Sequence, residues 1–258
     1  MQTSRIRIMG ILNVTDDSFY SKSRAVTEDA MISLIDRHIK EGADIIDIGG
    51  CSTRPGSVPA DARTEWERIR PALRIMVTRY PGIPFSVDTF RSGIVRRCYD
   101  EFGPFTVNDI SAGEDDPRML RTVASLGLGY IAMHKRGTPS TMQGMCEYGD
   151  VVADIVGYFR RFAVKAGDMG IEDWILDPGF GFAKTISQNY EMLDRLAEFK
   201  VLGRKILVGI SRKSFIYRAL GITPEEALDA TTELHRKAVA NGADILRVHD
   251  VAAAAALR

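Results

Sequence analysis

The sequence predicts a (β/α)8 TIM barrel formed by a single α/β domain over residues 1–258, and three observations favour it. The chain has 258 residues, 45% of them hydrophobic, which suits one large core. Short runs rich in Ile, Val, Leu and Phe alternate with longer segments of helical periodicity, a pattern typical of parallel strands joined by helices. No Pro/Ser-rich or low-complexity tract divides the chain.

Eight apolar runs are predicted to form the strands. They occupy residues 6–14, 44–50, 84–89, 105–111, 129–135, 174–179, 205–211 and 245–250. Eight strand and helix units fit a closed barrel, although an open doubly wound sheet would give the same alternation.

Helical periodicity predicts helices between these strands. Segment 27–42 opens with a threonine cap and acidic residues, 61–80 follows Pro59, and 116–127 ends on a glycine. Further helices are expected near 150–168, 186–199 and 224–241. Only VAAAAALR follows the last predicted strand, so the final helix should be shortened.

Charge and cysteine content exclude several classes of protein. Lys+Arg and Asp+Glu both number 34, so no net charge marks the chain for nucleic acid or an anionic membrane. The N-terminal apolar run is too short and interrupted for a signal peptide or a membrane span. The three cysteines are widely spaced and lack metal-binding neighbours, which predicts reduced thiols and a cytoplasmic location.

Polar residues close most of the predicted strands. Strands covered on both sides should be nearly all hydrocarbon, so these residues need a task. They are Asn13, Asp88, Asn108, Asp109, His134, Asp177, Lys213, Arg247 and His249. Because (β/α)8 enzymes carry their active sites at the carboxyl ends of the strands, we expect one pocket floor. Taken singly, each residue could instead cap a strand or form a buried ion pair.

Several motifs, in order, resemble the dihydropteroate synthase family. NVTDDSF at 13–19 and DIGGCSTRPG at 47–56 match two loops of the family, and SVDTF, VNDISAG, MHKRGTP, LDPGFGFAKT, GISRKSF and RVHD continue its pattern. SRK and RVHD discriminate best, because more distant pterin-binding methyltransferase domains lack the complete set.

The resemblance implies a transferase of folate biosynthesis. It would condense 6-hydroxymethyl-7,8-dihydropterin pyrophosphate with p-aminobenzoate to give 7,8-dihydropteroate and pyrophosphate. An SN1-like path suits this reaction, because breaking the C–O bond needs stabilisation of the departing pyrophosphate more than a strong nucleophile. The resemblance also implies Mg2+ as cofactor, sensitivity to sulfonamides, and a homodimer formed through the outer helices.

The family's site residues carry over position by position. The implied pterin-binding residues are Asp88, Asn108, Met133, Asp177, Gly181, Phe182 and Lys213. The implied p-aminobenzoate residues are Phe19, Thr53, Arg54, Pro55 and Ser214. The diphosphate residues are Asn13, Arg247 and His249, with Asn13 also holding Mg2+, and the catalytic residues are Asp88, Lys213, Arg247 and His249. Without the resemblance, the STRPG loop would be interpreted as a surface turn.

The first two loops depart from the family pattern. Asp16 replaces a proline, Ser21-Lys22-Ser23-Arg24 replace an aspartate and glycines, and Cys51 stands where the family usually has a glutamate. None of these changes removes a residue assigned to the pterin or the diphosphate, so an active enzyme is expected.

Three other interpretations remain open from the sequence. A pterin-binding methyltransferase domain would hold methyltetrahydrofolate beside a corrinoid partner and would not need Lys213 or Arg247. A barrel that only sequesters pterins would release no pyrophosphate. Another phosphate-handling barrel would carry Gly-rich turns after its last two strands, where this chain has Ser-Arg-Lys and Arg-Val-His-Asp.

Overall fold

Strands and helices alternate through the computed structural model, which describes residues 5–15, 28–52, 58–138 and 140–258. The strands are β1 (Arg7–Asn13), β2 (Ile45–Gly49), β3 (Phe85–Asp88), β4 (Thr106–Asp109), β5 (Gly129–Met133), β6 (Trp174–Asp177), β7 (Leu207–Val208) and β8 (Ile245–Val248). The α-helices are α1 (Glu28–Glu41), α2 (Ala62–Arg79), α3 (Ser92–Phe102), α4 (Met119–Leu126), α5 (Val151–Gly167), α6 (Ile186–Asp194), α7 (Ser214–Leu220), α8 (Leu228–Ala240) and α9 (Val251–Ala255). Three 3-10 helices are η1 (Met142–Gly144), η2 (Leu196–Leu202) and η3 (Glu225–Ala227).

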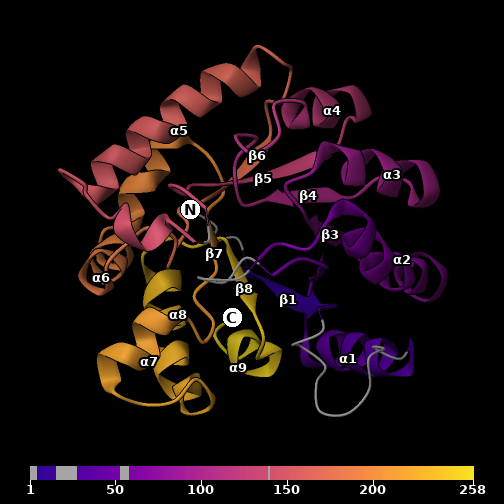
Figure 1. The fold of residues 1–258 in the computed structure, drawn as a ribbon. Helices are drawn as coiled ribbons and strands as arrows, with labels where there is room; N and C mark the ends of the chain where they lie inside the picture. The colour runs from indigo at the N-terminus through magenta and orange to yellow at the C-terminus, as the bar shows by residue number, and fades with distance from the viewer. Residues whose placement is uncertain (1–4, 16–27, 53–57, 139) are drawn as a thin grey trace.

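The strands form a parallel barrel inside a ring of helices (Figure 1). They pair in the order β6-β5-β4-β3-β2-β1-β8-β7. A parallel bridge between Leu176 of β6 and Ile206, just before β7, joins the two ends of this sheet. The Leu176 amide also donates a 2.9 Å hydrogen bond to the Lys205 carbonyl. The predicted (β/α)8 barrel is confirmed.

Most predicted elements are present, with differences at the ends and in several helices. The segment predicted at 186–199 divides into α6 and η2. Helix α9 has five residues, which confirms the shortened final helix. The segment expected near 224–241 divides into η3 and α8. No helix was predicted at α3 or α7. The apolar face of α3 is carried by Ile94, Val95 and Cys98 among many charged residues. No helix in the described ranges is both long and apolar enough to cross a membrane.

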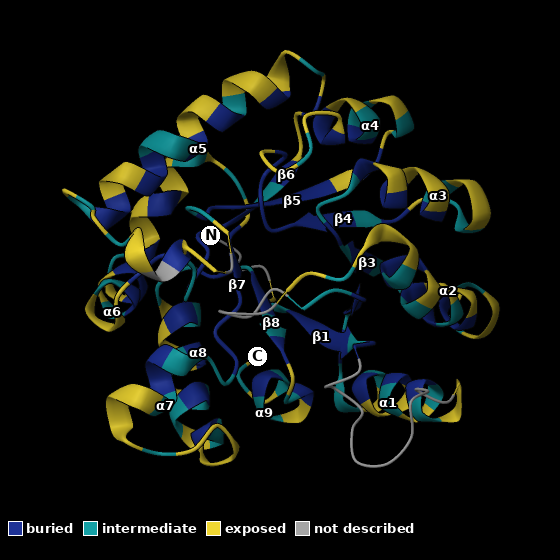
Figure 2. Ribbon diagram, in the orientation of Figure 1, coloured by how far each residue is buried: buried dark blue, intermediate teal, exposed yellow. Residues whose placement is uncertain are grey.

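Two apolar layers determine where along the barrel axis the polar residues lie. The larger core lies between strands and helices, and Figure 2 shows buried strands surrounded by helices whose outer faces are exposed. A second cluster is formed by Met9, Ile45, Ile131, Leu207 and Ile245. Ile175 of β6 packs against this cluster. Because strand side chains alternate between faces, the residues two positions after Ile45, Ile175 and Ile245 point to the same side of their strands. These residues are Asp47, Asp177 and Arg247. The polar site therefore lies directly above an apolar layer.

Gly179 marks the tightest approach between two strand-end loops. Its φ is +75°, and a Cβ at this position would lie 1.9 Å from the His134 carbonyl oxygen. Neither the left-handed backbone nor a contact with another backbone atom can be relieved by rotating a side chain. The loop after β6 can pass the end of β5 only with glycine here.

Gly179→Ala should therefore lower the free energy of unfolding by at least about 2 kcal/mol. Urea denaturation would measure this as a lower midpoint at constant m-value. Gly82→Ala is the matched control, because a Cβ there meets nothing within 4 Å, and its effect should stay within about 0.5 kcal/mol. Equal stability of the two variants would contradict the contact with His134.

Candidate active site

The predicted site residues gather at the carboxyl end of the barrel. Asn13, Asp88, Met133 and Asp177 end β1, β3, β5 and β6, Asn108 lies in β4, Arg247 lies in β8, and Lys213 precedes α7. A Cβ built on Gly49 would lie 3.4 Å from Asn13 Oδ1 and 3.3 Å from Asp88 Cβ. The glycine thus leaves room between these two side chains.

A hydrogen-bonded network fills the barrel interior below the strand ends. Arg247 donates from Nε to Asp47 at 2.7 Å and from Nη2 to Asp88 at 2.8 Å. Asn108 Nδ2 donates to both Asp47 oxygens, at 3.3 and 3.2 Å, and Ser86 Oγ donates to Asp47 at 2.5 Å. Asp47 is fully buried. Asp47 was not predicted as a site residue, although a charged residue inside the apolar run DIIDIGG was a usable signal.

Burial shifts the pKa of the charged groups in this site. It raises the pKa of Asp88 to about 7, while Arg247 acts in the opposite direction. Burial also raises the pKa of Asp177, against the effect of Lys213. It lowers the pKa of Lys213 to about 8, although Asp177 favours the cation. The pKa values of Asp88 and Lys213 therefore lie close to neutral pH, and that of Asp177 is raised from its usual value.

Lys213 lies across the loop that follows β6. Its Nζ donates to the Phe180 carbonyl and lies 4.7 Å from the centroid of the Phe182 ring. A Cβ on Gly181, where φ is +79°, would come within 3.2 Å of Lys213 Cδ. Gly181 and Phe182 thus both lie next to the Lys213 side chain.

A bidentate ion pair fixes the segment that carries Lys213. Arg212 has a left-handed backbone with φ of +52°, which costs energy for a residue with a Cβ. Its guanidinium donates to both oxygens of Asp250, at 2.8 and 2.7 Å. This pair joins the loop after β7 to the end of β8. His249 is exposed, and its Nδ1 lies 3.1 Å from Ser211 Oγ.

A buried lysine supports the loop that carries Asp177. Asp177 Oδ1 accepts from the Gly179 amide at 2.8 Å. Lys184 Nζ donates to the Gly179 and Phe182 carbonyls at 2.9 Å each and lies 3.1 Å from His134 Nδ1. Burial holds the pKa of Lys184 well below its usual value. No role was predicted for Lys184 from the sequence.

Two residues expected in the pocket floor lie elsewhere. His134 is buried with its ring edge against Tyr158, at 4.9 Å between centroids. Asp109 is buried and accepts hydrogen bonds from Tyr130 Oη at 2.7 Å and from the Gly113 amide at 2.8 Å. Asp109 follows Asn108 directly, and His134 follows Met133, so alternation along the strand turns each away from its neighbour. The expectation that all strand-end polar residues converge was wrong for these two.

Most of the residues predicted for p-aminobenzoate lie outside the described ranges. They are Phe19, Thr53, Arg54 and Pro55, and the departures at Asp16 and residues 21–24 lie outside as well. Ser214 is half-buried at the first position of α7, next to Lys213.

Cys51 lies beside a buried ion pair at the end of β2. Arg91 pairs with the fully buried Glu65 and donates to the Ala60 carbonyl at 2.5 Å. Burial raises the pKa of the Cys51 thiol, and the nearby Glu65 acts in the same direction. A protonated thiol is a poor nucleophile, so this geometry does not make Cys51 a reactive site.

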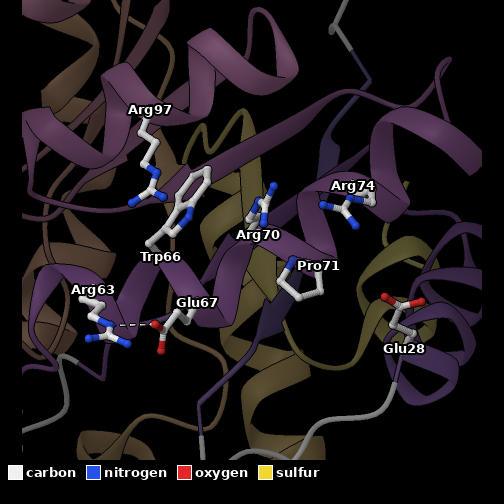
Figure 3. Close-up of a pocket in the computed structure, with 8 residues that line it drawn as sticks. All are labelled: Glu28, Arg63, Trp66, Glu67, Arg70, Pro71, Arg74 and Arg97. Atoms are coloured by element: carbon white, nitrogen blue, oxygen red, sulfur yellow. Dashed lines mark hydrogen bonds and ion pairs between the residues drawn. The ribbon is translucent and has the colours of Figure 1, made fainter.

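A surface groove between the outer helices is separate from this cluster (Figure 3). Trp66 and Arg70 of α2 and Arg97 of α3 are among its lining residues. Arg97 lies 4.3 Å from the Trp66 ring centroid, and Arg70 pairs with Glu101 at 2.8 Å. None of the residues predicted for the site lines the groove, so it is not the strand-end pocket.

The Asn13 side chain can supply one oxygen to a metal ion that is also coordinated by a bound ligand. No group of three His, Cys, Asp or Glu side chains in the described ranges is arranged to cage a metal. Mg2+ needs no such cage, because it is usually held by one or two protein oxygens, water and phosphate. Asn13 presents a carboxamide oxygen beside Gly49, where no side chain intervenes. This donor set fits Mg2+ bound together with a diphosphate.

Comparison with known proteins identifies relatives along nearly the whole chain. Residues 9–249 match the family model described as pterin binding enzyme. The dihydropteroate synthase of Synechocystis sp. is 41% identical over 97% of this chain and 87% of its own length. The dihydropteroate synthase of Escherichia coli is 39% identical over 97% of this chain and 89% of its own length.

Solved structures agree in fold with these sequence relatives. A Yersinia pestis dihydropteroate synthase in a sulfonamide complex has a TM-score of 0.92 and 34% identity, covering 100% of this chain and 93% of its own. A Xanthomonas albilineans dihydropteroate synthase with 4-aminobenzoic acid has a TM-score of 0.90 and 36% identity, covering 99% and 92%.

Lys213 should become reactive toward an acylating reagent with a midpoint near pH 8, because burial lowers its pKa to about 8. Labelling rates measured by peptide mass spectrometry across a pH series would give this midpoint, with the exposed Lys165 as reference for reagent decay. Asp177→Asn should move the midpoint lower, since it removes a carboxylate that favours the cation. A midpoint near the ordinary 10.5 would contradict the burial of Lys213.

Proposed function

The chain belongs to the dihydropteroate synthase family of pterin-binding enzymes, and we propose that its strand-end cluster is the catalytic site of that activity. As a member of this family it is a transferase that condenses 6-hydroxymethyl-7,8-dihydropterin pyrophosphate with p-aminobenzoate. The products are 7,8-dihydropteroate and pyrophosphate. One observation supports this assignment of the site. Asp88, Asn108, Asp177 and Lys213 come from four separate segments and lie together above one apolar layer.

Asn108 and Asp177 recognise the pterin ring. The aminopyrimidinone edge of a pterin presents N–H donors and acceptors that an amide and a carboxylate can pair. Asn108 Nδ2 is engaged by Asp47, which leaves its carbonyl oxygen for a donor on the ring. Asp177 Oδ1 accepts from Gly179, and the carboxylate has further acceptor capacity. Met133 and Phe182 close the two sides of the slot.

Asn13, Arg247 and His249 take the diphosphate. Asn13 would hold Mg2+ through its side-chain oxygen, and the bound ion would supply positive charge to the diphosphate oxygens. Arg247 has five N–H donors, of which those at Nε and Nη2 are oriented by Asp47 and Asp88. Its other donors and the exposed ring of His249 face the leaving group.

The reaction proceeds by departure of pyrophosphate before the amine attacks. The C–O bond at the pterin methylene breaks, and its electron pair leaves with pyrophosphate. The electron-rich ring and the Asp88 carboxylate stabilise the resulting cation, and the p-aminobenzoate nitrogen then forms the new C–N bond and loses a proton. Preorganised charges are effective here because the barrel interior has little water to screen them. No covalent bond to the enzyme is required.

We assign Ser214 to the p-aminobenzoate pocket and, from their match to the family's motifs alone, Phe19, Thr53, Arg54 and Pro55 as well. Ser214 supports this assignment by its position beside Lys213. We also propose a cytoplasmic homodimer in which the outer helices meet. Val164 on α5, Val201 on η2 and Leu220 on α7 are large apolar side chains exposed on the outer elements.

Purified protein should convert hydroxymethyl-dihydropterin pyrophosphate and p-aminobenzoate to dihydropteroate and pyrophosphate in equal amounts when Mg2+ is present. Lys213→Ala and Asn108→Ala should each lower kcat/KM by at least about 100-fold, as loss of a preorganised polar group does elsewhere. Chelation of Mg2+ should abolish turnover. Arg70→Ala, in the outer groove, is the control and should retain activity. Tight pterin binding without pyrophosphate release would instead identify a pterin-sequestering barrel.

The pH dependence of kcat/KM should be bell-shaped. Asp88 must be ionised, so activity should rise as pH increases through about 7, where its carboxyl loses its proton. Lys213 must be charged, so activity should fall as pH passes about 8. Because these groups interact, the two limbs describe the coupled pair. Lys213→Arg should remove the alkaline limb, and a wild-type profile that is flat over about pH 6 to 9 would contradict these assignments.

A further inference from the structure

Asp47 is a fully buried carboxylate that contacts neither the substrates nor the reacting atoms in the reaction proposed above. It lies in the middle of β2, and its side chain accepts from Ser86 of β3, Asn108 of β4 and Arg247 of β8. Strand β3 separates β2 from β4, and β1 separates β2 from β8. The bonds to Asn108 and Arg247 therefore cross the barrel interior.

The charge of Asp47 determines which way the Asn108 amide faces. Arg247 supplies the counter-charge at 2.7 Å, and an ionised carboxylate can only accept hydrogen bonds. The Asn108 nitrogen, at 3.2 and 3.3 Å from the two oxygens, must therefore be the atom that faces Asp47. A carbonyl oxygen in its place would lie against the Asp47 oxygens without a donor between them, and two opposed buried acceptors are costly.

We propose that Asp47 is a positioning residue that sets the pterin specificity of Asn108 by fixing its amide with the carbonyl oxygen toward the substrate. The inference rests on the proposed function, because the amide orientation matters only if Asn108 contacts the pterin. With the nitrogen held by Asp47, Asn108 presents an acceptor and selects an N–H group on the ring. Without Asp47, the amide can turn and present a donor to the same group.

A reciprocal exchange of the two residues separates positioning from general stabilisation. In Asp47→Asn, neither residue fixes the other, since two amides can pair in either orientation. In the double variant D47N/N108D, the amide at position 47 donates and the carboxylate at position 108 accepts, so an acceptor again faces the pterin. Ser86→Ala is the matched control, because it removes a bond to Asp47 and leaves those to Asn108 and Arg247.

The experiment measures the affinity of each variant for 6-hydroxymethyl-7,8-dihydropterin by isothermal titration calorimetry. Asp47→Asn should weaken binding at least about tenfold, as a mismatched buried hydrogen bond does. The double variant D47N/N108D should recover most of that loss. Ser86→Ala should change the affinity little. Unchanged affinity in Asp47→Asn, or a folded double variant that recovers none of the loss, would overturn the inference. Failure of the wild-type protein to bind the pterin would instead refute the proposed function.

A measurement on the wild-type protein keeps the inference testable if Asp47→Asn fails to fold. The side-chain NH2 signals of Asn108 can be followed by NMR during titration with the same dihydropterin, with the Asn108→Asp spectrum used for assignment. They should shift little, because Nδ2 stays on Asp47 while the carbonyl oxygen contacts the ligand. A large shift with a new intermolecular contact from Nδ2 to the ring would overturn the inference.

Discussion

The pairing of buried charges inside the barrel is the interaction on which the rest of the site depends. Asp47 is fully buried and the Asp88 side chain is only 12% exposed, so an unpaired charge on either would be strongly unfavourable. Arg247 bonds to both, and although burial opposes its charge, the two carboxylates raise its pKa above the usual value. Removing one member would leave the others uncompensated, so this network and the position of Asn108 form one unit.

A second set of polar contacts, outside the barrel interior, holds the strand-end loops in place. Lys184 binds two carbonyls of the loop after β6 and lies beside His134, which follows β5. Arg212 and Asp250 join the segments after β7 and β8. The Asp177 carboxylate and the Lys213 amine are therefore placed by side chains that do not themselves lie in the proposed pterin slot. Rigid placement of this kind reduces the reorganisation needed when substrate binds.

The alternation of apolar runs and helical segments predicted eight strands and a shortened last helix, and the count of eight units favoured a closed barrel over an open sheet. It did not reveal α3, because Arg96, Arg97, Asp100 and Glu101 obscure the apolar face of that helix. The site was predicted less completely. The ends of the predicted strands identified Asp88, Asn108 and Asp177. Side chains alternate between the two faces of a strand, so predicting that Asp109 and His134 point away from the pocket requires the exact strand register, which the apolar runs do not give. Asp47 lies in mid-strand, and only its contacts across the barrel reveal its place in the site.

A crystal structure of the protein with 6-hydroxymethyl-7,8-dihydropterin bound would test most directly whether the interior network positions the substrate. The account predicts a ring between Asn108 and Asp177, close to Lys213, with the guanidinium of Arg247 still bonded to Asp47. A ring bound away from the strand ends would contradict it. So would an Arg247 side chain that leaves Asp47 to stack on or pair with the pterin.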